Sequence, residues 1–123
     1  MGKYDSYIEG WRARMAQEHV EQQKRMTEIR KAVDKCADLL ARQFGVQRVY
    51  LFGSLVEESL IHARSDIDLA VEGLPSHVYF KALSALWDLL PPGVELDLVP
   101  LEDAHDTLRE KIKTRGRLLY ERK

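Results

Sequence analysis

The sequence predicts an α+β fold in two layers, with a small β-sheet flanked by helices and an additional helix at the N-terminus. In several segments apolar residues recur every three or four positions, as on one face of an α-helix. Between these segments lie short runs of β-branched and other apolar residues that stop at glycine or proline, which is typical of strands. The 123 residues, 45% of them hydrophobic, suffice to enclose one core. We therefore expect a single sheet along which helices and strands alternate.

The N-terminal part divides by its apolar pattern into two segments. A helix is expected to begin near Ser6, but residues 16–25 are almost all polar. Apolar residues return at helical spacing in residues 26–44. We expect residues 1–25 to form a helical extension and residues 26–123 to form the folded domain. The pattern leaves open whether the extension continues the same helix, and whether it contacts another protein or a second copy of this chain.

The rest of the domain alternates strands with helices. The runs VQRVYLF, DIDLAV and VELDLV are expected to be strands, because they are short, apolar and bounded by turn residues. Segments with helical periodicity separate them. In chain order the expected elements are a strand at 46–52, a short helix at 54–61, a strand at 66–71, a helix from 76 to about 89, a strand at 94–99, a helix at 101–113 and a short strand after Gly116.

The composition excludes several classes of partner and location. Nineteen basic and twenty acidic residues give a formal net charge of -1, so no overall field attracts nucleic acid or an anionic membrane. We expect no obligate nucleic-acid partner and no membrane association. Cys36 is the only cysteine, the start MGKYDSY lacks a secretory apolar region, and no apolar run approaches the roughly 20 residues that span a bilayer. A cytoplasmic location is expected.

Three aspartates are predicted to gather on one face of the sheet. Residues two apart in a strand point to the same side, so Asp66 and Asp68 project together, away from their apolar neighbours. Asp97 occupies a matching polar position in the strand at 94–99 and joins the pair if the two strands are adjacent. Carboxylate oxygens are the ligands that magnesium prefers, and three carboxylates can hold two ions about 4 Å apart for phosphoryl transfer. These residues are therefore candidate magnesium ligands.

Gly53 and Ser54 supply a candidate phosphate site beside the aspartates. A glycine lets a phosphate approach the backbone, and free amides at the start of a helix favour anions. The Ser54 hydroxyl adds one more hydrogen-bond donor. A strand, a Gly-Ser pair, a short helix and an Asp-x-Asp strand thus predict a triphosphate site next to a metal site.

The motifs LFGS at 51–54, SDIDLAV at 65–71 and LDLV at 96–99 closely resemble the minimal nucleotidyltransferase (MNT) family of the polymerase-beta superfamily. The similarity spans roughly residues 46–123. It implies a small mixed sheet flanked by helices, nucleotide-phosphate contacts at Gly53 and Ser54, and magnesium ligation by Asp66, Asp68 and Asp97. The resemblance also implies that Asp97 is the base toward the acceptor hydroxyl. Ser65, which opens the second motif, is included among the expected nucleotide-binding residues.

Two features depart from the family pattern. Leu55 stands where many relatives have an arginine, and glutamates follow it, so positive charge is removed from the phosphate side. The eleven residues between Ser54 and Asp66 are one more than is common in the family. Arg64 and His62 lie in this segment, where they either contact the nucleotide or are simply solvated.

The resemblance implies a Mg²⁺-dependent transfer of a nucleoside monophosphate, AMP from ATP, to a hydroxyl of a partner protein. Members of the family are commonly encoded beside a helical HEPN ribonuclease toxin, which they silence by attaching AMP to a tyrosine. This chain is therefore expected to be an antitoxin with a HEPN-type partner. Two alternatives remain open, namely a non-catalytic antitoxin that blocks its partner sterically and a transferase that modifies small molecules.

Overall fold

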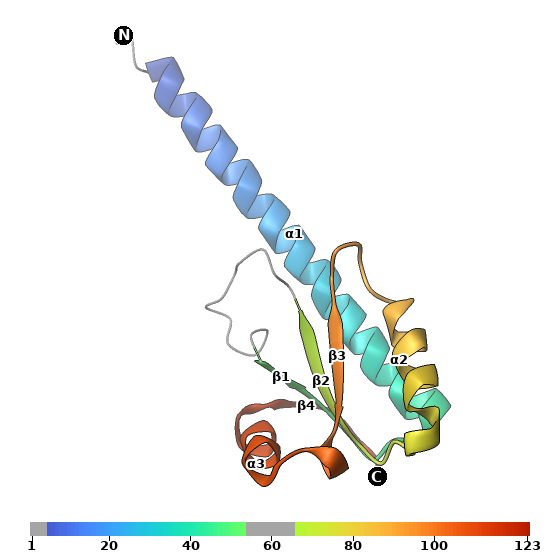
Figure 1. Ribbon diagram of the computed structural model, residues 1–123. Helices are drawn as coiled ribbons and strands as arrows, with labels where there is room; N and C mark the ends of the chain where they lie inside the picture. Colours follow the sequence, from blue (N-terminus) through green and yellow to red (C-terminus); the bar gives the residue numbers. More distant parts are fainter. Residues whose placement is uncertain (1–4, 54–65) are drawn as a thin grey trace.

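The structure is a computed structural model that describes residues 5–53 and 66–123 (Figure 1). In the described residues the strands form one sheet in the order β3-β2-β1-β4, with β1 antiparallel to both of its neighbours and β2 parallel to β3. The predicted α+β class with a small mixed sheet is therefore confirmed. The elements, where η denotes a 3₁₀ turn, are α1 Asp5–Phe44, β1 Arg48–Phe52, β2 Ile67–Glu72, η2 Ser76–Val78, α2 Tyr79–Trp87, β3 Leu96–Pro100, η3 Leu101–Asp103, α3 Asp106–Arg115 and β4 Arg117–Glu121.

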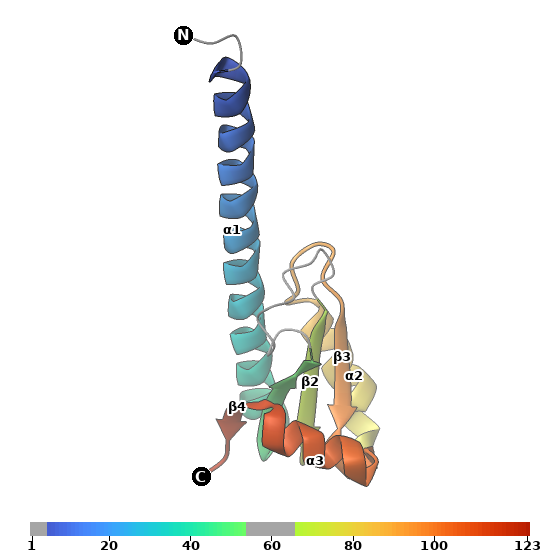
Figure 2. The ribbon, with the colours of Figure 1, turned by 90° about the vertical axis from the view of Figure 1, so that its left-hand side faces the viewer.

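Helix α1 is one continuous helix of 40 residues, so the N-terminal segment extends the core helix and does not form a separate one. Figures 1 and 2 show that its first half projects beyond the sheet. All side chains from Ile8 to Arg25 are exposed, whereas Ile29 is fully buried. Burial thus begins where the apolar stripe of the sequence begins, because only that part of the helix has a sheet to cover.

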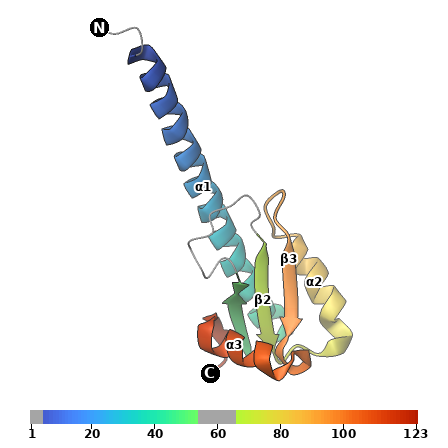
Figure 3. The same ribbon diagram turned by 60° about the vertical axis from the view of Figure 1, so that its left-hand side comes forward.

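The main core lies between one face of the sheet and the helices α1 and α2. Alternate residues of β2, among them Ile67 and Leu69, point into this core together with Leu96 and Leu98 of β3. A second, smaller cluster of Ala70, Leu101 and Ile112 packs on the other face, under α3. In Figure 3, α3 passes in front of the strands while α1 lies behind them. The polar positions of β2 and β3 therefore share a face with α3.

Several element boundaries differ from those expected. The strands expected at 46–52, 66–71 and 94–99 are Arg48–Phe52, Ile67–Glu72 and Leu96–Pro100. The helix expected at 76–89 begins with the 3₁₀ turn η2 and ends at Trp87, shortly before Pro91 and Pro92. The short helix expected at 54–61 lies outside the described residues.

The helix expected at 101–113 is divided, because Ala104 and His105 adopt extended backbone conformations between η3 and α3. The Arg109 side chain compensates for this break. Its Nε donates to the carbonyl oxygen of Leu101 at 2.9 Å, and its Nη2 donates to that of Ala104 at 3.0 Å. Carbonyl groups that a continuous helix would have used are thereby satisfied by one side chain.

Candidate active site

The three predicted aspartates lie at the same end of the sheet, where the parallel strands β2 and β3 both begin. Asp68 and Asp97 are direct partners in the register of these strands. Asp66 immediately precedes β2, and the register is fixed there by the Ile67 amide, which donates to the Glu95 carbonyl oxygen at 2.8 Å. The adjacency on which Asp97 depended is therefore present. The two paired aspartates project from the face opposite to the main core, because their apolar neighbours are buried in it.

Charge repulsion is concentrated at Asp68. Partial burial is the largest cause that raises the pKa of this carboxyl, and the neighbouring carboxylates of Asp97 and then Asp66 raise it further. Together they lift the pKa of Asp68 from its ordinary 3.8 to about 6. A cation placed between the carboxylates would reverse this effect, because it favours their charged forms. The site therefore has the electrostatic character of a cation site.

Gly53 directly follows β1 and lies beside Asp68. Its neighbour Phe52 pairs with Asp68 across the antiparallel strands. Gly53 has a φ of +78°, and a Cβ atom built on it would collide with Oδ2 of Asp68. Both observations require glycine at this position, because only glycine adopts this conformation freely and leaves the space open. The backbone at Gly53 thus lies against the central carboxylate, and its contact with a phosphate stays a prediction.

Other predicted site residues lie outside the described part of the chain. They are Ser54 and Ser65, together with Leu55, His62 and Arg64 of the same segment. Their expected contacts with the nucleotide remain predictions.

A cavity of about 290 Å³ opens at the aspartates and continues around the edge of the sheet to α2. Tyr79 of α2 reaches across this edge, and its hydroxyl donates to the carbonyl oxygen of Leu98 at 2.7 Å. Burial and the nearby Asp97 carboxylate both raise the pKa of Tyr79. Nothing in the local sequence marks Tyr79 as part of the site, because its position depends on how α2 packs beside β3. The lining residues are Phe52, Asp68, Tyr79, Leu83, Leu96, Asp97, Leu98, Val99 and Leu108.

The donor chemistry of the site fits magnesium. All three side chains offer carboxylate oxygens, the ligand type that this ion prefers, and their mutual repulsion is relieved by a bound cation. In the described ranges, no group of three or more His, Cys, Asp or Glu side chains is already close enough together to hold a metal ion. The fit thus rests on ligand type and charge, and not on a preformed coordination shell.

Comparison with known proteins identifies relatives for most of the chain. The sequence model of the family described as Polymerase beta, Nucleotidyltransferase matches residues 34–123. The matched segment begins inside α1 and leaves the projecting half of that helix outside it. No curated protein matches the sequence. Within the described residues, no helix is long and apolar enough to cross a membrane.

Solved structures with the same fold include toxin–antitoxin complexes. A chain of a toxin–antitoxin complex with AMP-PNP is 28% identical, with a TM-score of 0.59 over 73% of this chain and 74% of that one. A chain of an MntA toxin–antitoxin complex, in a variant with two Asp-to-Glu substitutions, is 26% identical with a TM-score of 0.58 and the same coverage. A protein from Shewanella oneidensis, 23% identical with a TM-score of 0.52 over 76% of this chain and 71% of that one, shares the fold. The resemblance to nucleotidyltransferases of toxin–antitoxin pairs is thereby confirmed.

Proposed function

Because this chain belongs to the polymerase beta nucleotidyltransferase family, we propose that it transfers a nucleoside monophosphate from a nucleoside triphosphate to a hydroxyl group of a partner protein. The observation that carries this proposal is the direct pairing of Asp68 with Asp97 beside the Gly53 backbone. In this proposal it joins carboxylates that would bind a cation to a glycine backbone that would contact a phosphate.

Asp66, Asp68 and Asp97 would hold magnesium, up to two ions. When bound, the metal would neutralise the negative charge of the triphosphate and the charge that develops on the leaving pyrophosphate. Gly53, with Ser54 and Ser65 after it in the chain, would contact the phosphates. Positioning and charge neutralisation then supply most of the rate enhancement.

The chain's own residues account for the proton and the orientation of the acceptor. The acceptor oxygen forms a bond to the α-phosphorus, the bond from that phosphorus to the oxygen bridging the α- and β-phosphates breaks, and pyrophosphate leaves. Asp97 takes the proton of the acceptor hydroxyl. This carboxylate suits that role because it is exposed and lies on the edge strand β3, where a second protein has access.

ATP is the proposed donor, and a HEPN-type toxin is the proposed acceptor. The similarity to a toxin–antitoxin complex that contains AMP-PNP supports ATP as the donor and a toxin as the partner. The HEPN type of that toxin follows from the family resemblance. In this proposal the chain is the antitoxin, and it silences the toxin by attaching AMP to a side-chain hydroxyl, a tyrosine by resemblance to the family.

The test is transfer of label from α-labelled ATP, with magnesium, to the protein encoded by the adjacent gene. The wild type should label that protein, and Asp66→Asn should not, although it still folds and binds the partner. Full labelling by Asp66→Asn would refute the mechanism.

A second candidate is a non-catalytic antitoxin that binds its partner and blocks it sterically. It is favoured by Leu55, which stands where many relatives have an arginine and so removes positive charge from the phosphate side. In that case the wild type would bind the partner tightly and inhibit it with no transfer of label.

A further inference from the structure

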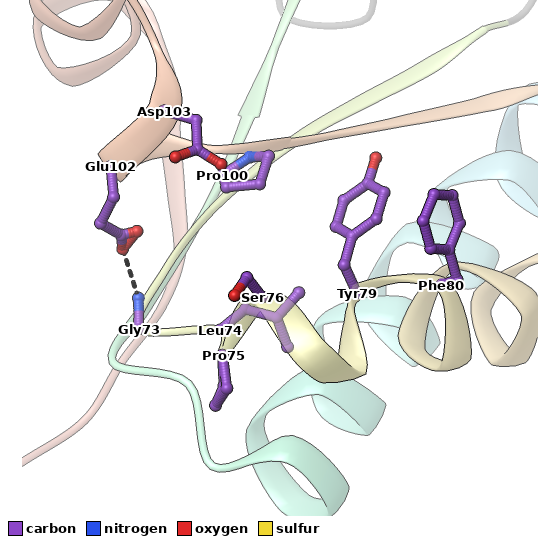
Figure 4. A pocket seen from close by; sticks show the side chains of 9 residues that line it. All are labelled: Gly73, Leu74, Pro75, Ser76, Tyr79, Phe80, Pro100, Glu102 and Asp103. Carbon is purple, nitrogen blue, oxygen red and sulfur yellow. Dashed lines mark hydrogen bonds between the residues drawn. The ribbon is translucent and has the colours of Figure 1, made fainter.

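A second cavity, of about 660 Å³, lies beside the C-terminal ends of β2 and β3, at the end of the sheet opposite to the aspartates (Figure 4). Its walls come from the segment after β2, the first turn of α2, and η3. Figure 4 shows Tyr79 and Phe80 side by side on α2, across from Pro100, Glu102 and Asp103. The lining residues are Gly73, Leu74, Pro75, Ser76, Tyr79, Phe80, Pro100, Glu102 and Asp103.

This second cavity adjoins the candidate active site. Tyr79 lines both cavities, and their linings take up successive residues of the edge strand β3, up to Val99 in the candidate site and Pro100 in the second cavity. Asp97 and Pro100 lie three positions apart, which corresponds to roughly 10 Å, and Glu102 and Asp103 lie beyond Pro100. We call the two neighbouring cavities along the β3 edge, which meet at Tyr79, the edge groove.

Among the residues that the structure describes, the lining of the second cavity is apolar and acidic and includes no basic residue. Phe80 is 79% exposed, so much of its ring is available for contact with a ligand. Glu102 uses Oε1 to accept a hydrogen bond from the Gly73 amide at 2.7 Å, so this carboxylate is held at the cavity wall. Such a lining repels a triphosphate and attracts a cation that can lie on an aromatic ring.

At its C-terminal half the β3 edge offers few backbone groups to another strand. The Leu98 carbonyl oxygen already accepts the hydrogen bond from Tyr79, and Pro100 has no N–H group. An occupant of the edge groove therefore binds through its side chains and not by extending the sheet.

From this geometry we infer that the edge groove binds the acceptor segment of the partner protein, which carries a lysine or arginine at least about 10 Å from the hydroxyl to be modified. The inference rests on the proposed function. The hydroxyl lies at Asp97, the basic side chain lies on Phe80, and its charge pairs with Glu102 and Asp103. Charge complementarity and continuity with the catalytic carboxylate select this occupant over a nucleotide or a second copy of the chain.

The experiment uses the full chain, its HEPN-type partner as the probe, and two pairs of matched variants. Asp103→Lys is compared with Glu110→Lys, which makes the same charge change at an exposed position on α3 outside the groove. Phe80→Ala is compared with Trp87→Ala, another exposed aromatic of α2 that does not line the cavity. None of the four residues has been assigned to the chemistry.

Asp103→Lys and Phe80→Ala should each weaken partner affinity, measured without nucleotide, by at least about tenfold, and both controls should stay within about twofold. In the transfer reaction the same two variants should raise KM for the partner and leave KM for ATP unchanged. Equal affinities for Asp103→Lys and Glu110→Lys would overturn the inference. Because affinity is measured without nucleotide, it decides the inference even if the wild type transfers no label, a result that would refute only the proposed function.

Discussion

Two carboxylates on one strand, Asp68 and Glu72, have opposite surroundings. They lie four residues apart on β2 and point to the same face of the sheet. Glu72 accepts a hydrogen bond from Nη1 of Arg48 at 2.8 Å, and Nζ of Lys113 lies 3.9 Å from its other oxygen. Asp68 instead faces the carboxylates of Asp97 and Asp66.

The difference separates a structural end of the sheet from the end that we propose is catalytic, called here the functional end. At Glu72 the chain supplies the compensating cations itself, so the charge is neutralised on folding. At Asp68 the described residues supply further negative charge, and we propose that a ligand compensates it. Uncompensated charge of this kind lowers stability, and it persists where binding or catalysis uses it.

The largest effect is expected from Asp68→Asn, which removes the central charge of the functional end. Transfer of AMP should fall by at least about a thousandfold, because a candidate metal ligand is lost. In metal-free protein the same change should raise the free energy of unfolding by about 1 kcal/mol, because repulsion and desolvation are relieved. Activity assays and denaturant titration in EDTA measure the two effects. A loss of both activity and stability would contradict the account.

Gly53→Ala should lower transfer by about ten- to a hundredfold and stability by about 1–2 kcal/mol. The added Cβ collides with the Asp68 carboxylate and meets a positive φ. Gly45→Ala is the matched control, because Gly45 also has a positive φ, +61°, but open space around its Cβ position. The control should lose stability and keep its activity. Comparable activity losses in both variants would show that contact with Asp68 is not the cause.

Glu72→Gln tests the structural end. It should cost about 1 kcal/mol of stability, since Arg48 and Lys113 lose a partly buried partner, and leave transfer unchanged within about twofold. Glu121→Gln removes only a longer, more exposed contact with Arg48, 3.9 Å away, and should change stability by less than about 0.5 kcal/mol. Chemical denaturation measures both, and a large loss of transfer in Glu72→Gln would break the division between the two ends.

The smallest effect concerns pH. Since the pKa of Asp68 is raised to about 6 in the folded protein, its ionised form destabilises the native state above that pH. As pH falls through about 6, the carboxyl takes up a proton and this cost is lost. The stability advantage of Asp68→Asn in EDTA should therefore be largest at pH 7–8 and shrink toward pH 5. An advantage that does not change with pH would contradict the assigned cause.

The sequence predicted the local features of the site better than its long-range ones. Alternation within each strand placed Asp68 and Asp97 on the polar face of the sheet. Gly53 has a positive φ, and the Asp68 carboxylate lies close to its backbone, as only glycine permits. The place of Tyr79 could not be predicted, because its hydroxyl reaches a carbonyl on β3 nineteen residues away. The break between η3 and α3 was not predicted, because helical periodicity indicated one continuous helix. The side chain of Arg109, several residues later, donates hydrogen bonds to carbonyl oxygens near the break.

The central claim is that the aspartate end is built for a cation together with a nucleotide. Thermal unfolding of the full chain tests it most directly, with magnesium and an ATP analogue that carries a methylene group between its α- and β-phosphates. We predict that magnesium and the analogue together raise the Tm of the wild type by at least about 5 °C. Either ligand alone should give a smaller rise, and Asp68→Asn should show no rise with both. An equal rise in Asp68→Asn, or none in the wild type at millimolar ligand, would contradict the claim.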